Sequence, residues 1–220
     1  MAGMKPYTEE QALSILNSRA FRTGEHARNQ ALFVVQLCLG PRINEELRLT
    51  IGDVVDSWGR LRDRVTFTHT KNGKNRTIKI LNELIYRFLP PWLERLAESG
   101  YTLGSDPLFP GQGRAAAVSD RQVRYIYQAA NEEIGLVDGY STHSCRKTWA
   151  CQTYDWLCAE LRRGANIEPL SELAILGGWE TVEAARRYLA DHVSRAAACQ
   201  QAIYPKIRAW LNSAKKCSEN

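Results

Sequence analysis

The feature that most constrains the fold is a short alternating stretch in an otherwise helical sequence. Residues 65–70 alternate between Val, Phe or His and Thr, which is the periodicity of a β-strand. The Asn72-Gly73 pair that follows is a strong turn signal, and residues 76–80 supply a return strand. The sequence therefore predicts a two-stranded antiparallel hairpin.

The remainder of the sequence has the patterns of helices and of the loops between them. Thr8 followed by Gln11 is a capping-box signal, and residues 29–39 form an almost continuous apolar run typical of a buried helix. Gly40-Pro41 ends that run. We expect helices over residues 8–18, 29–39, 44–49, 82–98, 119–134, 143–161, 169–176, 181–189 and 193–214, and loops over residues 22–28 and 103–118. Pro90-Pro91 predicts a helix break or the start of a second helix.

These patterns predict a mainly α fold with a small antiparallel β-sheet, which is an α+β fold. With 220 residues, of which 44% are hydrophobic, the chain suits one domain with a sizeable core. We expect this domain over residues 1–214 and a loose tail over residues 215–220.

The cysteines and the apolar runs indicate where such a chain resides. The six cysteines include no C-x-x-C pair, and several lie in apolar, helix-like stretches. This favours a reduced chain over a disulfide framework or a zinc site. The first ten residues have no apolar signal core, and no apolar run reaches membrane-spanning length. The sequence therefore predicts a cytoplasmic protein with no metal site and no membrane partner.

Positive charge is concentrated on the predicted hairpin. The net charge of +5 permits a nucleic-acid partner without requiring one. Between residues 60 and 79, however, seven lysines and arginines accompany a single acid, Asp63. We expect these cations to contact DNA phosphates, although solubility explains part of the same charge. The expected DNA contacts are Arg60, Arg62, Arg64, Lys74, Arg76 and Lys79, with Arg121 and Arg124 on a later helix.

Four short motifs carry side chains suited to phosphate chemistry, and each has an ordinary structural interpretation as well. Arg42 follows the Gly-Pro break and precedes Glu45 by three residues. The pair is either a phosphate-binding guanidinium held by a carboxylate or a helix-end ion pair. His143 and Arg146 share one helix face near an N-terminus, where phosphates bind readily. Alone, they fit a structural histidine and a solvated arginine equally well.

The other two motifs are an aromatic pair and a turn lysine. Gly177-Gly178-Trp179 is followed nine residues after the tryptophan by Tyr188, and both aromatic residues also suit a protein core. Lys71 lies at the predicted hairpin turn. There it is a solvated turn residue, a contact in a DNA groove, or a proton donor to a leaving oxygen.

In chain order the motifs run Arg-x-x-Glu, hairpin Lys, His-x-x-Arg, Gly-Gly-Trp and Tyr. This order and spacing resemble the catalytic domain of the tyrosine recombinase (phage integrase) family, from about Thr8 to Ala198. The Gly-Gly-Trp version is similar to that of Cre recombinase, because most members carry His where Trp179 stands. The resemblance implies a site-specific DNA recombinase or integrase. Such enzymes cleave and rejoin DNA through a 3′-phosphotyrosyl intermediate, without metal, ATP or another cofactor.

The resemblance also implies a role for each motif residue. Arg42 and Arg146 are expected to hold the scissile phosphate, with Glu45 positioning Arg42 and, as a further option, His143. Trp179 is expected to donate its indole N–H to the phosphate. Fixed cationic donors suit this reaction, because phosphoryl transfer concentrates negative charge on the non-bridging oxygens.

The remaining roles concern the nucleophile and the protons. Tyr188 is the implied nucleophile, and a phenol with a pKa of about 10 needs a base and a positive field to react at neutral pH. His143 is expected to assist by hydrogen bonding and proton transfer. Lys71 is the implied general acid for the leaving 5′-hydroxyl.

The sequence departs from the family pattern in three ways. In the common His-x-Leu-Arg-His motif, Cys145 and Lys147 replace the leucine and the second histidine. A role for a second histidine is therefore not expected. Trp179 cannot transfer protons, which leaves that task to His143 or Lys71. Arg42 comes early, so we expect no separate N-terminal core-binding domain, as in a fragment or a short family member.

The partners and two other functions follow from the same analogy. We expect double-stranded DNA as the partner, a homotetramer on DNA and a monomer without it. A catalytically silent DNA-binding regulator is an alternative, although the complete motif set argues against it. A type IB topoisomerase or a telomere resolvase uses the same chemistry and is a further alternative.

Overall fold

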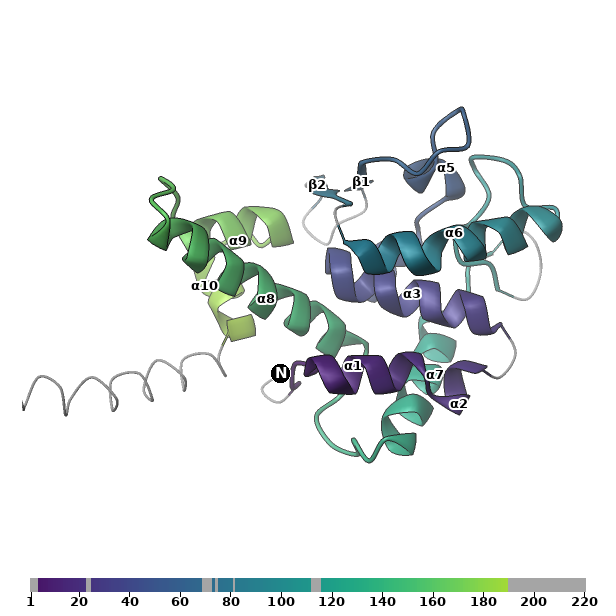
Figure 1. The fold of residues 1–220 in the computed structure, drawn as a ribbon, viewed down its shortest axis with the longest axis horizontal. Helices are drawn as coiled ribbons and strands as arrows, with labels where there is room; N and C mark the ends of the chain where they lie inside the picture. The colour runs from purple at the N-terminus through teal and green to yellow at the C-terminus, as the bar shows by residue number, and fades with distance from the viewer. Residues whose placement is uncertain are drawn as a thin grey trace, which may run out of the picture.

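The computed structural model describes residues 4–22, 25–68, 73, 75–80, 82–111 and 116–189 (Figure 1). In these ranges the elements are α1 (Glu9–Leu16), α2 (Arg19–Arg22), α3 (His26–Leu39), α4 (Ile43–Glu46), α5 (Ile51–Val54), β1 (Arg64–Phe67), β2 (Arg76–Lys79), α6 (Glu83–Glu98), α7 (Asp120–Glu133), α8 (Thr142–Arg162), α9 (Pro169–Gly177), α10 (Val182–Arg186) and the 3₁₀ turn η1 (Arg187–Leu189). The expected helix over residues 193–214 and the expected tail lie outside the described residues.

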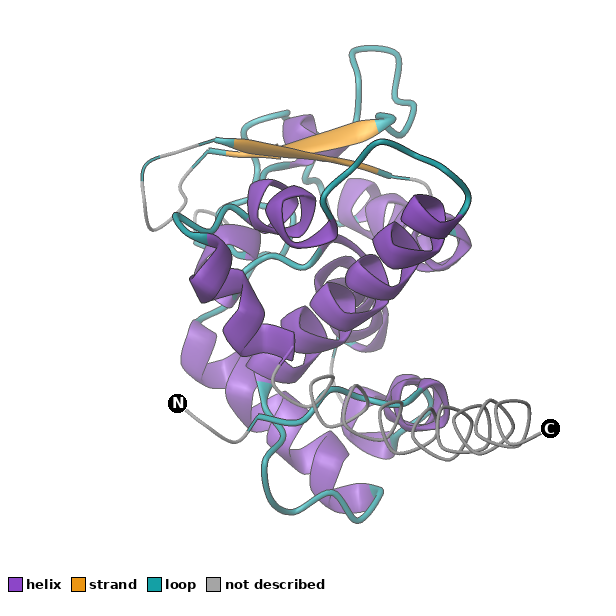
Figure 2. Cartoon of the chain, turned by 90° about the vertical axis from the view of Figure 1, so that its left-hand side faces the viewer, coloured by secondary structure: helices purple, strands orange, loops and turns teal. Residues whose placement is uncertain are grey.

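The antiparallel hairpin predicted from residues 65–70 and 76–80 is confirmed. β1 and β2 pair antiparallel, with Val65 opposite Ile78 and Phe67 opposite Arg76. All four of these side chains are buried. Figure 2 shows the two strands lying across one end of the helical body. Of the predicted turn pair, Gly73 is described and has a φ of 68°, whereas residue 72 lies outside the described residues.

Helix α3 forms the centre of the molecule, as its apolar run predicts. Ten of its residues are buried, and α6 and α8 both pack against it. Near the middle of the helix, Phe33 contacts Tyr7, Phe21 and Tyr127 in an aromatic cluster with ring centroids 5.5–5.8 Å apart. The C-terminal end of α3 leads directly into the motif that begins at Gly40.

Three boundary predictions were wrong. Helix α6 runs unbroken through Pro90-Pro91. Its buried face includes Leu89 and Trp92. Because proline has no N–H, the carbonyls of residues 86 and 87 lack their helical donors, and these residues are exposed to water. The expected loop over residues 22–28 also contains the end of α2 and the start of α3. Helix α8 begins at Thr142, one residue before the expected start, and Ser141 caps it.

The last part of the described chain lies beside one end of α8. Helices α9 and α10 pack against each other, and both α9 and η1 pack against α8. In Figure 1 these elements form a group at the left of the helical body. None of the helices in the described ranges is long and apolar enough to span a membrane.

Candidate active site

Arg42 is positioned by a left-handed turn at the end of α3. Gly40 has a φ of 61°, and a Cβ there would lie 2.2 Å from the Trp149 side chain. Only glycine fits this turn, which directs the chain into α4. Arg42 then precedes α4, and its Nη1 donates to Glu45 Oε1 at 2.6 Å while its backbone N–H donates to Oε2 at 3.0 Å. The guanidinium is thereby held at the edge of the protein, with 20% of the side chain exposed.

Glu45 holds a second arginine as well. Its side chain is 2% exposed, and the carboxylate also accepts from Nη2 of Arg76 at 3.1 Å. Burial by itself raises the pKa of Glu45, but the Arg42 backbone N–H and the Arg76 charge outweigh it and leave the pKa below its ordinary value. The carboxylate is therefore ionised at neutral pH. The expected support of Arg42 by Glu45 is present as a direct ion pair.

The prediction that Arg76 contacts DNA from the surface was wrong. Its side chain is 2% exposed, because alternation along β2 turns it inward beside Ile78. Besides Glu45, it donates to the carbonyls of Leu39, Gly40 and Leu176 at 3.3–3.4 Å. Burial lowers the pKa of Arg76. The side chain belongs to the interior of the site.

Arg146 comes from the first turns of α8 and is 1% exposed. It donates to the carbonyl of Gly40 through Nη1 and to that of Gly177 through Nη2, the second at 2.6 Å. Its Nε is buried without a partner among the described residues. Burial, with repulsion from Arg76 and Arg42, lowers the pKa of Arg146. A guanidinium still stays charged at neutral pH.

His143 lies in the first turn of the same helix and is partly buried. Its ring centroid is 6.5 Å from that of Tyr188, with 22° between the two planes. Burial, followed by the charges of Arg146 and Arg42, lowers the pKa of His143. The imidazole is therefore neutral at neutral pH and able to accept a proton.

Trp179 depends on the two glycines before it. Gly178 ends α9 with a φ of 63°, and a Cβ on Gly177 would lie 1.8 Å from the Trp179 ring. The indole lies under Arg146, whose guanidinium carbon is 4.5 Å from the ring centre. Its Nε1 is buried and has no hydrogen-bond partner among the described residues. An unpaired buried donor costs free energy, which an acceptor bound here would recover.

Tyr188 lies in η1 and is the last residue of this group in the chain. Its ring centroid is 4.7 Å from that of Trp179, and the Arg146 guanidinium carbon is 5.6 Å from the Tyr188 ring centre. The thiol of Cys151 on α8 donates to the Tyr188 carbonyl at 3.7 Å. The phenol therefore lies within a positive field, beside a neutral imidazole.

Five of the six predicted catalytic residues thus come together from four segments of the chain. They are Arg42, His143, Arg146, Trp179 and Tyr188. Lys71 lies outside the described residues. The buried role of Arg76 was missed, although strand alternation places it on the inward side with Ile78. Lys147, in place of the common second histidine, donates to the carbonyl of Met4 at 2.7 Å.

The other expected DNA contacts that the structure describes are exposed, and most have partners. Arg60 pairs with Asp56, Arg64 with Asp63 and Arg124 with Asp120, at 2.7–3.0 Å. Arg62 donates to two backbone carbonyls, and Arg121 donates to the hydroxyl of Tyr125. Lys79 is exposed on β2, and Lys74 lies outside the described residues. These arginines are available at the surface, but their acid partners reduce the net charge there.

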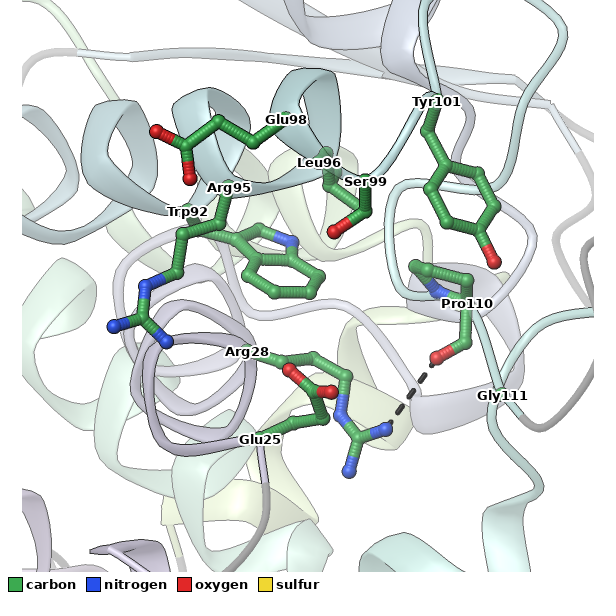
Figure 3. A pocket seen from close by; sticks show the side chains of 10 residues that line it. All are labelled: Glu25, Arg28, Trp92, Arg95, Leu96, Glu98, Ser99, Tyr101, Pro110 and Gly111. Carbon is green, nitrogen blue, oxygen red and sulfur yellow. Dashed lines mark hydrogen bonds between the residues drawn. The ribbon is translucent and has the colours of Figure 1, made fainter.

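A pocket of about 460 Å³ lies elsewhere on the molecule (Figure 3). It opens between the start of α3, the end of α6 and the loop near Pro110. Arg28 is buried there and donates to the Pro110 carbonyl at 3.4 Å. None of the predicted site residues lines this pocket. No group of three or more His, Cys, Asp or Glu side chains within the described ranges is arranged to hold a metal ion.

Comparison with known proteins identifies the family of this chain. The model of the phage integrase family matches residues 6–195. No curated protein is similar enough in sequence to count as a match.

The fold is similar to several solved structures. XerH bound to the palindromic difH substrate, in a post-cleavage complex, is 20% identical with a TM-score of 0.63, over 90% of this chain and 53% of XerH. XerA recombinase is 19% identical with a TM-score of 0.65, over 91% of this chain and 66% of XerA. A lambda integrase dimer bound to a COC′ core site is 17% identical with a TM-score of 0.61, over 87% of this chain and 49% of the integrase. The chain thus spans about half to two thirds of these proteins.

Proposed function

The chain belongs to the phage integrase family, and from this premise we propose that it is a site-specific tyrosine recombinase. In this proposal it cleaves and rejoins DNA strands by transesterification at Tyr188. The observation that carries it is the placement of the Tyr188 ring beside Trp179, Arg146 and the neutral His143. A tyrosine that only packs in a protein core would not require a buried guanidinium such as Arg146 or an unpaired indole N–H such as that of Trp179 beside it.

In the first step the Tyr188 phenolic oxygen attacks the scissile phosphorus. The bond from phosphorus to the 5′-oxygen breaks, and a 3′-phosphotyrosyl ester forms. The phenolic proton passes to His143, whose lowered pKa leaves the imidazole free to accept it. The leaving 5′-oxygen takes up a proton, for which the family pattern designates Lys71.

Arg42 and Arg146 stabilise the negative charge that develops on the non-bridging oxygens. Arg146 is held rigidly by two carbonyls and Arg42 by Glu45, so little reorganisation is needed when the charge appears. The Trp179 indole N–H supplies a further donor to the same oxygens. Two fixed guanidinium groups provide the charge that Mg²⁺ supplies in other phosphoryl transfers.

Rejoining is the reverse reaction with a different strand end. A 5′-hydroxyl attacks the phosphotyrosyl ester, the phenol leaves, and His143 returns its proton. The ester conserves the energy of the broken phosphodiester, so the proposed reaction needs neither ATP nor a metal.

The proposed partner is double-stranded DNA, held in part by the exposed arginines of the hairpin and of α7. The DNA complexes of XerH and lambda integrase support this partner by their similar fold. The charges of Arg124 and Asp120 both act on His143, so the start of α7 lies near the site. We propose assembly as a homotetramer on DNA, in a reduced cytoplasmic setting.

The test is covalent attachment to DNA. Wild type and Tyr188→Phe are incubated with supercoiled plasmid at low salt in EDTA, and the reaction is stopped with SDS. We expect relaxed plasmid and SDS-resistant protein–DNA adduct in the wild type alone. Binding without an adduct in either protein would identify a catalytically silent regulator. Relaxation without exchange between two identified sites would identify a topoisomerase.

A further inference from the structure

Arg76 is the most deeply buried charge in the site that the proposed mechanism does not use. Its guanidinium makes four contacts, one to Glu45 and one each to the carbonyls of Leu39, Gly40 and Leu176. The side chain also covers the ring of Phe67, with 4.3 Å between the guanidinium carbon and the ring centre. A strand residue on this inward face is ordinarily apolar, as Ile78 is.

The partners of Arg76 are also the partners of both proposed catalytic arginines. The Gly40 carbonyl accepts from Arg76 and from Arg146. The Glu45 carboxylate accepts from Arg76 and from Arg42. A shift of the Arg76 guanidinium therefore displaces an acceptor of each arginine at once.

The third motif is tied to the same group. Leu176, which accepts from Arg76, directly precedes Gly177, whose carbonyl accepts from Arg146. Gly178 leaves room for this arrangement, because a Cβ there would lie 3.0 Å from Cδ of Arg76. The planar guanidinium thus joins the end of α3, the start of α4 and the end of α9, which no apolar side chain of similar size is able to do.

We propose that Arg76 is a positioning residue that fixes both phosphate-binding arginines, Arg42 through Glu45 and Arg146 through the Gly40 carbonyl. It does not touch DNA. The inference rests on the proposed function, because it assigns Arg76 an indirect role in stabilising the transition state of that reaction. It predicts that loss of Arg76 weakens charge stabilisation at the phosphate and leaves DNA binding in place.

The test compares two phosphate chemistries. The position at which the wild type becomes attached to plasmid DNA is mapped by sequencing. Duplexes of that sequence are then made with either the normal phosphate or a methylphosphonate at the scissile position. A methylphosphonate lacks one charged oxygen, so its cleavage depends less on correctly placed guanidinium groups.

The variants are Arg76→Met, Arg76→Lys and, as a reference, Arg146→Lys. On the normal phosphate we expect Arg76→Met to lower the cleavage rate at saturating DNA by about 100-fold, with half-saturation unchanged. On the methylphosphonate we expect its defect to shrink at least tenfold, as for Arg146→Lys. Arg76→Lys keeps the charge without the planar guanidinium, and we expect its cleavage rate on the normal phosphate to lie between those of the wild type and Arg76→Met.

Arg163→Met is the matched control, since Arg163 is exposed at the end of α8 and paired only with Glu160 among the described residues. It should cleave both duplexes like the wild type. If Arg76→Met fails to fold, by thermal unfolding, then Arg76→Lys carries the comparison. Equal defects on both duplexes in the folded variants would overturn the positioning role alone. Absence of any Tyr188-dependent adduct in the wild type would overturn the proposed function, and the inference with it.

Discussion

Arg146 and Trp179 stack on each other, with 4.5 Å between the guanidinium carbon and the centre of the indole ring. The Nε1 of the same indole is buried and unpaired among the described residues. In the proposed mechanism, Trp179 thus both packs against the phosphate-binding Arg146 and donates its indole N–H to the phosphate. These two roles are separable by substitution.

Trp179→Phe keeps an aromatic ring against Arg146 and removes the N–H. We expect the rate of covalent adduct formation to fall by about 10- to 100-fold, the value of one hydrogen bond to a charged group. Trp179→His, which restores an N–H donor, should recover most of that loss. The measurement is the adduct yield over time at saturating DNA. A Phe variant as fast as the wild type would mean that the indole only packs.

The site has an excess of positive charge that an oxyanion should relieve. Among its described side chains, Arg42, Arg76 and Arg146 accompany the single carboxylate of Glu45. We expect vanadate to raise the melting temperature by about 3 to 6 °C at ten times its dissociation constant. Thermal unfolding with and without vanadate measures the shift. Arg146→Lys should reduce it, and a shift as large in that variant would place the anion elsewhere.

His143 predicts the shape of the pH profile. Its pKa is lowered by burial and by Arg146 and Arg42, so the imidazole gains its proton only below the usual value of about 6.5. The adduct-forming rate should therefore be flat around pH 7 and fall only as the pH drops below the usual imidazole pKa of about 6.5. His143→Gln should be slower and should lack this decline. An unchanged decline in that variant would assign it to another group.

Glu45 predicts an acid-sensitive part of the stability. Its pKa is below its ordinary value in the folded state, so its contribution is present above the unfolded-state pKa and is lost as the pH falls through the folded-state pKa. Glu45→Gln leaves Arg42 and Arg76 without a countercharge and should cost about 3 kcal/mol at pH 7. Denaturant unfolding of both proteins between pH 7 and pH 3 should show this difference shrinking below about pH 4.5. A constant difference would mean that packing, not charge, is lost.

The hairpin, the central helix and the motif residues were predictable from local patterns in the sequence. The alternation around Val65 and the apolar run of α3 each indicate which side chains are buried, and the structure buries them in that pattern. The continuity of α6 was not predictable, because it depends on packing of Leu89 and Trp92 that only the fold reveals. The start of α8 at Thr142 differs from the expected residue 143 by one position, which is within the usual uncertainty of helix ends.

Within the site, residue types were predictable and their shared acceptors were not. The sequence places Arg42, Arg146 and Tyr188 in one family pattern, but it does not reveal that the Gly40 carbonyl joins two arginines. The positive charge of the hairpin predicts a surface arginine at position 76, but the alternation along β2 turns its side chain inward. Contacts between segments more than 100 residues apart, such as Gly40 with Arg146, arise only from the tertiary fold.

Glu46 is a buried acid beside the site, and it predicts the opposite pH dependence from Glu45. Its side chain is fully buried, and neither carboxyl oxygen has a hydrogen-bond partner among the described residues. Burial raises the pKa of Glu46 well above its ordinary value, so the folded protein keeps a proton that the unfolded chain releases.

Such a group does not change the free energy of unfolding below its unfolded-state pKa. As the pH rises from there toward the folded-state pKa, it lowers the free energy of unfolding progressively. Glu46→Gln cannot ionise and has nearly the same shape. We expect the two proteins to unfold at similar denaturant concentrations near pH 4, and the variant to be the more stable one at pH 8. A wild type as stable as Glu46→Gln at pH 8 would mean that the folded protein accommodates the charged carboxylate, for instance by admitting water to it.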